Sequence, residues 1–366
     1  MTDPRWLRAD RTAIPTPPRL ETSALLAREH FAISAQLHLN ESSFPPSPAA
    51  VEAIRARAAN VNRYPETHGG TLGDALAART GIPRDRIVFG NGSDELLHLA
   101  CLAALEAGTE AVMPTPSFPR YRVSTLLQGA KPVNVGLRQD GANDVEGLIA
   151  AIGPATRAVF ACNPNNPTGA FFHDADLERL ASGVPAEVLL VIDEAYGEFA
   201  RPLGAPDTLA ALARRRGPWV VTRTFSKAYA LAGMRLGYAL ASDEALADGM
   251  ARGRTTFNVT DLALAAAEAA LADHAHVERL LATCAAGRTQ LDAGLRKLGL
   301  APLPTATNFI AVDLRRPVQP VLDALRASGV LAREFRDPGY ETFLRITVGI
   351  AEENAVALAA LAKALA

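Results

Sequence analysis

Four polar clusters in this sequence, each directly after a short apolar run, contain the side chains that could perform chemistry. They occupy residues 90–95 (GNGSDE), 163–169 (NPNNPTG), 193–196 (DEAY) and 222–237 (TRTFSKAYALAGMRLG). In the last cluster, the amine of Lys227 can hold an aldehyde, and the neighbouring hydroxyls together with Arg235 can hold a phosphate. A lone lysine is nearly always a solvated surface charge, so this interpretation depends on the other three clusters.

Each of those clusters also has an ordinary structural explanation. Residues 90–95 could cradle an anion or simply form a capped helix start. Glu95 stands where a dinucleotide fingerprint needs its third glycine, and the lysine of a Walker loop is absent. Residues 163–169 could be a plain turn, because Asn, Pro and Gly are common in turns. Asp193 follows a five-residue apolar run, where a carboxylate needs a cationic partner, but it could equally cap a helix.

The segments between the clusters predict the scaffold that positions them. From about residue 85, short β-branched runs alternate with helical stretches, which is typical of a largely parallel sheet with helices on both faces. Small ligands bind such sheets beyond the carboxyl ends of the strands, where the clusters stand. The predicted strands are residues 86–89, 111–113, 131–135, 158–161, 188–192 and 219–222, and predicted helices include residues 23–30, 48–59 and 93–105.

The chain changes character near residues 252–254, which predicts a second, smaller lobe. An alanine-rich helix over residues 261–286 leads into a series of helices and strands that ends in a strand at 343–348 and a final helix. Consecutive prolines make residues 38–46 an extended crossing segment. We therefore divide the chain into an N-terminal arm that packs on the small domain, a large domain and a small domain, at residues 1–45, 46–254 and 255–366.

Three motifs in a fixed order carry a resemblance to a known family. Asn-Pro-x-Asn-Pro-Thr-Gly, then Asp-x-x-Tyr, then Ser-Lys-x-x-x-Leu-x-Gly-x-Arg resemble the fold-type I pyridoxal-phosphate (PLP) aminotransferases, and within them the histidinol-phosphate aminotransferase branch. The likeness extends from Leu37 to Val348. It implies an α/β fold, in which a large PLP-binding domain has a mostly parallel, seven-stranded sheet covered by helices, and a smaller domain is α+β.

The resemblance implies roles for five residues around the cofactor ring. Lys227 would bind the aldehyde of PLP and, once displaced by the substrate amine, move the proton between the substrate Cα and the cofactor C4′. Asp193 would keep the pyridine nitrogen protonated. Asn166 and Tyr196 would hydrogen-bond the phenolic oxygen, and Phe118 would stack on the ring. Without the resemblance, Phe118 is equally well explained as a core aromatic.

A second group of residues would surround the cofactor phosphate, namely Ser93, Asp94, Thr224, Ser226 and Arg235. The first two would bind mainly through backbone N–H groups, and Arg235 through its guanidinium. Tyr64 matches a tyrosine that family members contribute to the phosphate site of the neighbouring subunit. The resemblance therefore implies an obligate homodimer.

Two arginines match positions that bind the substrate in the family. Arg345 matches the arginine for the substrate anion, and Arg333 matches a second arginine that assists with a substrate phosphate. A structural salt bridge would also explain Arg333. The implied reaction is transamination of histidinol phosphate with 2-oxoglutarate, in histidine biosynthesis.

The start of the chain follows the branch only in part. Residues 40–41 (NE) are present, but residues 42–44 (SSF) replace a more usual Asn-Pro-aromatic run. The branch usually has an early tyrosine that contacts the substrate phosphate, whereas no tyrosine precedes Tyr64 here. Phe31 or His30 is expected near that position, and neither reproduces a tyrosine hydroxyl. This departure concerns the substrate and leaves the general chemistry untouched.

Four other functions use parts of the same pattern. An aminotransferase for aromatic or other 2-oxo acids would keep the machinery and change the substrate, and a PLP decarboxylase of the threonine-phosphate type would share the phosphate-reading arginines. A PLP-sensing regulator would need a DNA-binding module ahead of Leu37, for which we expect no room. A nicotinamide dehydrogenase, inferred from residues 90–92, would leave Lys227 and Asp193 unexplained.

Composition argues against several further classes. A formal net charge of −2 lacks the excess of Lys and Arg that nucleic-acid binders show, and the basic run 214–216 reads as a solvated helix end. The three cysteines have no CxxC or zinc spacing, which predicts a reducing compartment. The N-terminus is too polar for a signal peptide, and no apolar run is of membrane length, so we expect a cytoplasmic protein. His274 and His276 are expected at the surface, and no metal site is predicted.

Overall fold

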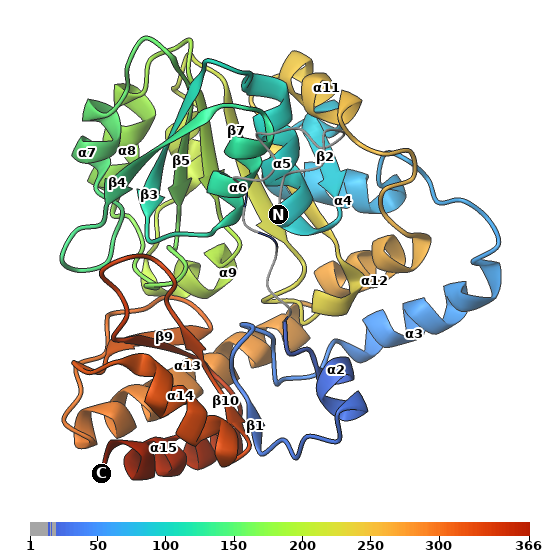
Figure 1. Cartoon of the computed structure of the whole chain (residues 1–366). Coiled ribbons are helices and arrows are strands. Elements are labelled where there is room, and N and C mark those ends of the chain that lie inside the picture. The colour runs from blue at the N-terminus through green and yellow to red at the C-terminus, as the bar shows by residue number, and fades with distance from the viewer. Residues whose placement is uncertain (1–13, 15, 17–19) are drawn as a thin grey trace, which may run out of the picture.

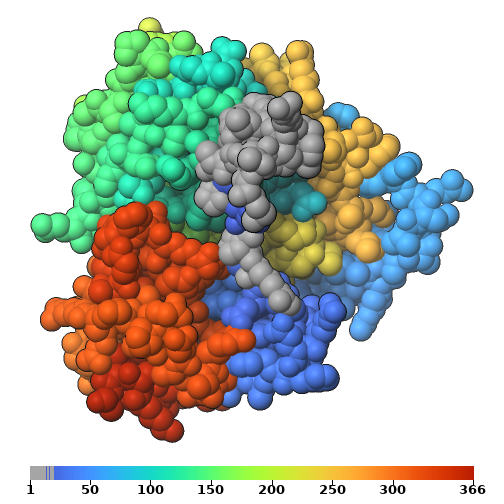
Figure 2. Space-filling view, in the orientation of Figure 1, coloured from blue at the N-terminus to red at the C-terminus, as the bar shows by residue number. Residues whose placement is uncertain are grey.

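The structure, a computed structural model, describes residues 14, 16 and 20–366 and has two lobes. The larger lobe has a central sheet between layers of helices (Figure 1). The smaller lobe contains the C-terminal helices and strands, and the first described segments of the chain lie beside it. Figure 2 shows this smaller lobe, in orange and red next to blue, across the lower half of the molecule.

A seven-stranded sheet forms the centre of the large lobe, as predicted. Its strand order is β2-β8-β7-β6-β5-β3-β4. Only the two pairings made by β8 are antiparallel. The strands are β2 (Ile87–Gly90), β3 (Glu110–Thr115), β4 (Lys131–Gly136), β5 (Thr156–Cys162), β6 (Leu189–Asp193), β7 (Trp219–Thr224) and β8 (Gly237–Ala241).

Helices cover both faces of this sheet because its strands are apolar on both faces. In β6, Leu190 and Ile192 belong to one hydrophobic cluster and Val191 to another, as expected when successive side chains alternate between faces. The cluster with Val191 includes residues of α5 (Gly92–Ala104), α6 (Arg120–Leu127) and α11 (Glu244–Arg252). The other includes residues of α4 (Gly70–Thr80), α7 (Val145–Ala150), α8 (Asp174–Gly183), α9 (Gly197–Ala200) and α10 (Thr208–Leu212).

The helix predicted over residues 261–286 is two helices, so that prediction was wrong in its extent. α12 (Asp261–Ala272) and α13 (His274–Lys297) meet at Asp273, whose carboxylate accepts a hydrogen bond of 3.2 Å from the N–H of His276. An aspartate can end one helix and cap the next, but no glycine or proline marks the break. The alanine-rich composition therefore concealed it.

The small lobe contains a three-stranded sheet and a short parallel pair. The sheet order is β11-β12-β9, from β9 (Phe309–Asp313), β11 (Arg333–Glu334) and β12 (Phe343–Thr347), with α14 (Val318–Ala327) and α15 (Ala351–Leu365) beside it. In the arm, β1 (Ala35–Gln36) pairs with β10 (Val330–Leu331), so this part of the chain contacts the small lobe. The domain boundaries after residues 45 and 254 stay predictions.

The remaining elements lie in the arm and at turns. α2 (Ser23–Arg28) begins at the side-chain cap Thr22, and α3 (Pro48–Arg57) begins at the cap Ser47. Residues 38–46 between β1 and α3 have no regular structure, as predicted from the prolines. Short 3₁₀ turns are Ala58–Asn60, Arg84–Arg86, Arg201–Leu203 and Ala232–Met234.

Two predictions of surface position were wrong. His276 is only 5 % exposed, because its face of α13 packs under the crossing segment, where Nε2 lies 2.9 Å from the carbonyl oxygen of Pro45. Arg215 is half-buried and donates to the carbonyl oxygens of Val184 and Val188 at 2.5 and 2.7 Å, whereas Arg214 and Arg216 are exposed. Both side chains satisfy distant carbonyl groups that the local pattern cannot indicate.

The part of the chain that the structure describes lacks two further features. No helix among them is long and apolar enough to cross a membrane. No group of three or more His, Cys, Asp or Glu side chains in the same residues could hold a metal ion.

Candidate active site

The polar clusters meet along one edge of the large sheet. Cys162, Asp193 and Thr222 are partners in register at the ends of β5, β6 and β7, so the loops that follow these strands start side by side. Two residues further along β7, Thr224 is in register with Gly237 of β8, which in turn pairs with Gly90 of β2. All four clusters therefore lie next to one another, as expected for a ligand site on a parallel sheet.

Asp193 is a buried carboxylate at the end of β6, with 2 % of its surface exposed. Oδ2 accepts a hydrogen bond of 2.8 Å from the hydroxyl of Tyr121, and Oδ1 accepts bonds from the N–H of Ala195 (3.0 Å) and the hydroxyl of Thr222 (3.2 Å). Burial raises the pKa of Asp193 to about 6, although these donors oppose the rise. No cation pairs with this carboxylate among the described residues.

Lys227 follows β7 and is half-buried. Its Nζ donates to the carbonyl oxygens of Asn40 (2.9 Å) and Leu39 (3.3 Å) in the crossing segment. Burial lowers the pKa of Lys227 to about 8, and the positive charge of Arg345 lowers it further. The amine is therefore much easier to deprotonate than that of a surface lysine.

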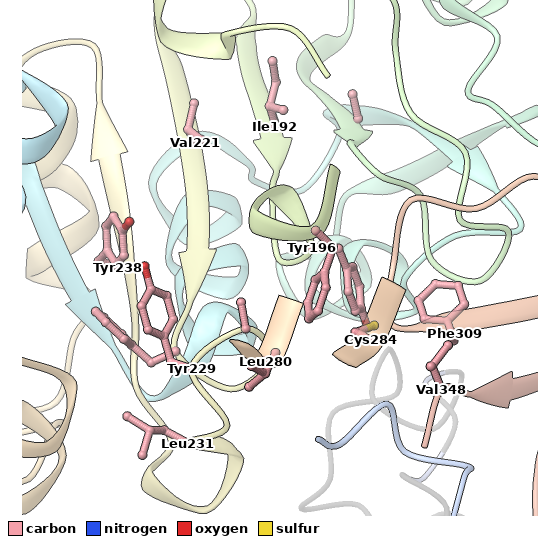
Figure 3. Packing of buried hydrophobic residues seen from close by; sticks show 14 of the residues in the cluster. Ile192, Tyr196, Val221, Tyr229, Leu231, Tyr238, Leu280, Cys284, Phe309 and Val348 are labelled. Atoms are coloured by element: carbon pink, nitrogen blue, oxygen red, sulfur yellow. The ribbon is translucent and has the colours of Figure 1, made fainter. Parts of the chain in front are cut away.

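Tyr196 and Asn166 lie between the two lobes. The buried hydroxyl of Tyr196 accepts a hydrogen bond of 2.9 Å from Nδ2 of Asn40, and its ring meets that of Phe309 edge to face at 5.2 Å (Figure 3). Oδ1 of Asn166 accepts a bond of 2.6 Å from Nη1 of Arg345. These two residues of the large lobe thus contact the arm and the small lobe.

The side chain of Arg235 packs directly against Gly92 where α5 begins. Gly92 has φ +75°, and a Cβ built on it would lie 2.5 Å from Nη2 of Arg235. The Arg235 guanidinium also lies 3.4 Å from the hydroxyl of Ser226. That hydroxyl accepts a bond of 2.9 Å from Thr224, and Ser93 is in the first turn of α5. Helix N–H groups, hydroxyls and a guanidinium together form a site for an anion.

Two further predicted residues, Asp94 and Phe118, contact the first turn of α6. Asp94 forms an ion pair of 2.5 Å with Arg120, which begins α6. Phe118 is half-buried, with its ring edge to face with that of Tyr121 at 6.0 Å. Tyr64 differs from the others, because 80 % of its surface is exposed and its ring stacks on Phe257 at 4.2 Å. None of its described contacts is with another residue predicted for the site.

Arg333 and Arg345 face each other across the antiparallel pair β11–β12. Paired residues of this kind project on the same side of a sheet, and like charges there repel. Burial lowers the pKa of both guanidinium groups, in Arg345 to about 10. Within the described residues neither forms an ion pair, and the buried Nε of Arg345 has no hydrogen-bond partner. The sequence alternative of a structural salt bridge for Arg333 finds no support there.

Phe31 and His30, the residues expected near the position of the missing tyrosine, do not contact the arginine pair in the described part of the chain. The guanidinium carbon of Arg326 lies over the ring of Phe31, 4.6 Å from the ring centroid. His30 is exposed and has φ +53°. Neither forms a hydrogen bond or ring contact with Arg333 or Arg345 among the described residues. The expectation that one of them occupies the tyrosine position is unsupported.

Sequence reasoning gave no role to several residues of the site. Tyr121 donates to Asp193, His38 accepts from Arg345 through its carbonyl oxygen at 3.0 Å, and Asn40 contacts both Tyr196 and Lys227. The only signals in the sequence were the dipeptide Asn40-Glu41 and the position of Tyr121 just after Phe118. Neither indicates which partner the side chain meets.

Comparison with known proteins assigns the family. The sequence model of the aminotransferase class I and II family matches residues 33–361. The chain belongs to this family. Histidinol-phosphate aminotransferase 2 of Pseudomonas aeruginosa is 45 % identical over 335 residues, which are 92 % of this chain and 90 % of the relative. Histidinol-phosphate aminotransferase of Moorella thermoacetica is 38 % identical over 90 % of this chain and 85 % of the relative.

A solved structure resembles this aminotransferase over its whole length. The histidinol-phosphate aminotransferase from Sinorhizobium meliloti, determined in complex with pyridoxal 5′-phosphate, superposes with a TM-score of 0.91 at 31 % identity. The match covers 100 % of this chain and 98 % of that one. The predicted fold class is confirmed, and the aminotransferase is an enzyme of the predicted type.

Proposed function

We propose that this aminotransferase uses pyridoxal 5′-phosphate to transfer an amino group from histidinol phosphate to 2-oxoglutarate. The observation that carries the proposal is the pair Arg333–Arg345, two cations in register on adjacent strands that form no ion pair within the described residues. Such a pair is suited to an anionic ligand, which would relieve the repulsion between the two groups. The names of the relatives support the same donor.

The residues of the site fit the cofactor. The buried carboxylate of Asp193 would pair with the protonated ring nitrogen. The N–H groups at the start of α5 and the guanidinium of Arg235, which lies where a Cβ on Gly92 would stand, would bind the phosphate. Ser93, Asp94, Thr224 and Ser226 would complete the phosphate site. When bound, this cofactor supplies a ring that accepts the electrons of a carbanion at the substrate Cα.

The chain's own side chains would carry out the remaining tasks. Lys227 would hold the cofactor aldehyde and later move a proton at Nζ, for which a pKa of about 8 is well placed. Tyr196 and Asn166 would hydrogen-bond the phenolic oxygen, and the ring of Phe118 would cover one face of the cofactor. Asp193 would stay ionised at neutral pH, above its pKa of about 6.

The arginine pair would serve two different substrates. The planar guanidinium of Arg345 can bind the carboxylate of glutamate through two parallel hydrogen bonds. A phosphate carries more charge and more acceptor oxygens than a carboxylate, so it can engage Arg333 as well. A single pocket could thus accept a donor that lacks a carboxylate.

A second copy of the chain would complete the enzyme. Tyr64 and Phe257 form an exposed aromatic stack. Val61, three residues before Tyr64, is 66 % exposed as well. Exposed aromatic side chains of this kind favour an interface, and Tyr64 would reach the phosphate site of the partner. Sedimentation should give twice the chain mass of 38.6 kDa. A fully active monomer at micromolar concentration would exclude the dimer.

The proposal places the enzyme in the reducing cytoplasm. Cys101, Cys162 and Cys284 are free and buried. Thiols without disulfide partners suit that compartment.

The test is an absorbance-monitored half-reaction of the PLP-loaded protein. Glutamate should convert the bound aldehyde to the amine form, and histidinol phosphate should do so at lower concentration than phenylalanine or tyrosine. Failure with glutamate would reject transamination. A preference for aromatic donors would reject only the substrate, and release of carbon dioxide from a phospho-amino acid would indicate a decarboxylase instead.

A further inference from the structure

Asn40 lies where the two lobes meet, and all of its polar groups have partners. It is 2 % exposed and has φ +53°, a conformation that asparagine tolerates better than most residues. Its N–H donates to Oγ1 of Thr347 at 3.0 Å. Its carbonyl oxygen accepts from Nζ of Lys227 at 2.9 Å and from Nδ2 of Asn308 at 3.1 Å. One residue of the arm therefore contacts both lobes.

The hydrogen bonds of Thr347 fix the orientation of the Asn40 side-chain amide. The Thr347 hydroxyl accepts the main-chain N–H of Asn40, so its own proton is available for Oδ1 of Asn40, 3.2 Å away. Nδ2 then faces the hydroxyl of Tyr196 at 2.9 Å. An amide NH₂ group can only donate, so the Tyr196 oxygen accepts there. The single proton of Tyr196 must point to another acceptor.

The surroundings of Tyr196 keep that proton in place. Burial raises the pKa of Tyr196 to about 12, while Arg345 and Asn40 oppose the rise and Cys162 and Asp193 add to it. The hydroxyl is therefore protonated at neutral pH. The ring of Tyr196 is buried and meets that of Phe309 edge to face, so rotation about the phenolic C–O bond is the main remaining freedom of the proton.

We propose that Asn40 is a positioning residue, whose amide directs the Tyr196 proton toward the phenolic oxygen of the cofactor and is itself oriented by Thr347 of the small lobe. This inference rests on the proposed function, because it requires the cofactor at the site. It makes the hydrogen bond from Tyr196 dependent on a residue of the other lobe. A donor at the phenolic oxygen stabilises negative charge there and makes the cofactor's imine nitrogen less basic.

Asn40→Gly removes only the amide. Glycine adopts a φ of +53° without strain and keeps the main-chain N–H and carbonyl groups. In the PLP-loaded enzyme without substrate, the pH midpoint of the cofactor absorbance change should rise, by at most about one unit, the shift expected if the hydrogen bond from Tyr196 to the charged oxygen is lost completely. The kcat for transamination should fall severalfold, with KM changed by less than about twofold.

Thr347 variants test the second link independently of Asn40→Gly. Thr347→Val removes the hydroxyl that orients the Asn40 side-chain amide, so the amide can turn over. The pH midpoint of the cofactor absorbance change should therefore rise, by less than in Asn40→Gly. Thr347→Ser keeps the hydroxyl and should restore the wild-type midpoint. A normal midpoint in both Asn40→Gly and Thr347→Val would overturn the proposal.

A double-mutant cycle separates positioning from a general structural effect. In a Tyr196→Phe background, Asn40→Gly should add no further shift of the midpoint, because the hydroxyl through which Asn40 acts is gone. An equal shift in both backgrounds would show that Asn40 acts by another route and would reject the inference while leaving the proposed function intact. If the unmodified protein develops no cofactor absorbance with PLP, the proposed function fails first and this inference with it.

Discussion

The hydroxyl of Tyr121 donates a hydrogen bond of 2.8 Å to Oδ2 of Asp193. Both side chains are buried, and the aspartate has no cationic partner among the residues that the structure describes. Burial raises the pKa of Asp193 to about 6, and Tyr121 opposes that rise. The fold thus holds a carboxylate at a position that disfavours its charge, which is expected if a bound ligand supplies the compensating cation.

Asp193→Asn should stabilise the protein without cofactor. Because the pKa is raised from 3.8 to about 6, the native state binds more protons than the unfolded chain between these values, and stability falls as pH rises through that window. The variant should therefore gain about 2–3 kcal/mol in the free energy of unfolding at pH 7.5 and little at pH 4. Denaturant titrations at both pH values measure this. A variant that is less stable than the wild type at pH 7.5 would contradict the destabilising charge assigned to Asp193. Although the variant is expected to be more stable, its affinity for PLP should be lower.

Capture of PLP should depend on the ionisation of Lys227. The neutral amine attacks the aldehyde, so the capture rate of the cofactor-free protein should rise with pH and level off above about pH 8. Arg345→Gln removes a positive charge that lowers this pKa, which should move the midpoint to higher pH. Arg336→Gln is the control, because Arg336 is not among the charges that act on Lys227. Stopped-flow absorbance gives the profiles, and a midpoint that moves down in Arg345→Gln would contradict this explanation.

Gly92→Ala should close the phosphate site. At φ +75° the new methyl group would be strained, and it would also meet the Arg235 guanidinium at 2.5 Å. We expect the Kd for PLP to rise by about tenfold or more, roughly 1.4 kcal/mol, in an absorbance titration. Gly153→Ala is the matched control, since a Cβ there meets nothing within 4 Å. Unchanged affinity in Gly92→Ala would place the phosphate elsewhere.

Arg333→Met should affect the phosphorylated donor more than glutamate. Loss of one charge-assisted contact to a phosphate predicts a KM for histidinol phosphate about tenfold higher. The KM for glutamate should change less, because Arg345 remains. Arg296→Met is the control, because it removes an exposed arginine that pairs with Asp292 at 2.8 Å, and it should leave both constants unchanged. Equal losses for both substrates in Arg333→Met would assign Arg333 a general role instead of phosphate recognition.

Local sequence signals predicted the sheet and the polar clusters at its edge. The strands are short β-branched runs, and a cluster such as residues 163–169 follows directly after one of them, so a local pattern is sufficient. The same reasoning placed Asp193 and Lys227 at the ends of neighbouring strands. It could not place Tyr121, whose bond to Asp193 spans 72 residues, or Asn40, whose bond to Thr347 spans 307.

The errors have related causes. The break at Asp273 depends on one capping side chain within a continuous run of helix-forming residues. His276 is buried because the crossing segment packs over it, and that contact with Pro45 spans 231 residues. In both cases the deciding partner lies outside any local pattern.

The most direct test of the central claim is borohydride reduction of the PLP-loaded enzyme, followed by peptide mapping. The other lysines of the chain are Lys131, Lys297 and Lys363, so the modified position can be assigned without ambiguity. We predict that the reduced cofactor is attached at Lys227 and that Lys227→Ala carries none. Attachment at another lysine, or no attachment in protein saturated with PLP, would contradict the assignment of Lys227 as the cofactor-binding amine.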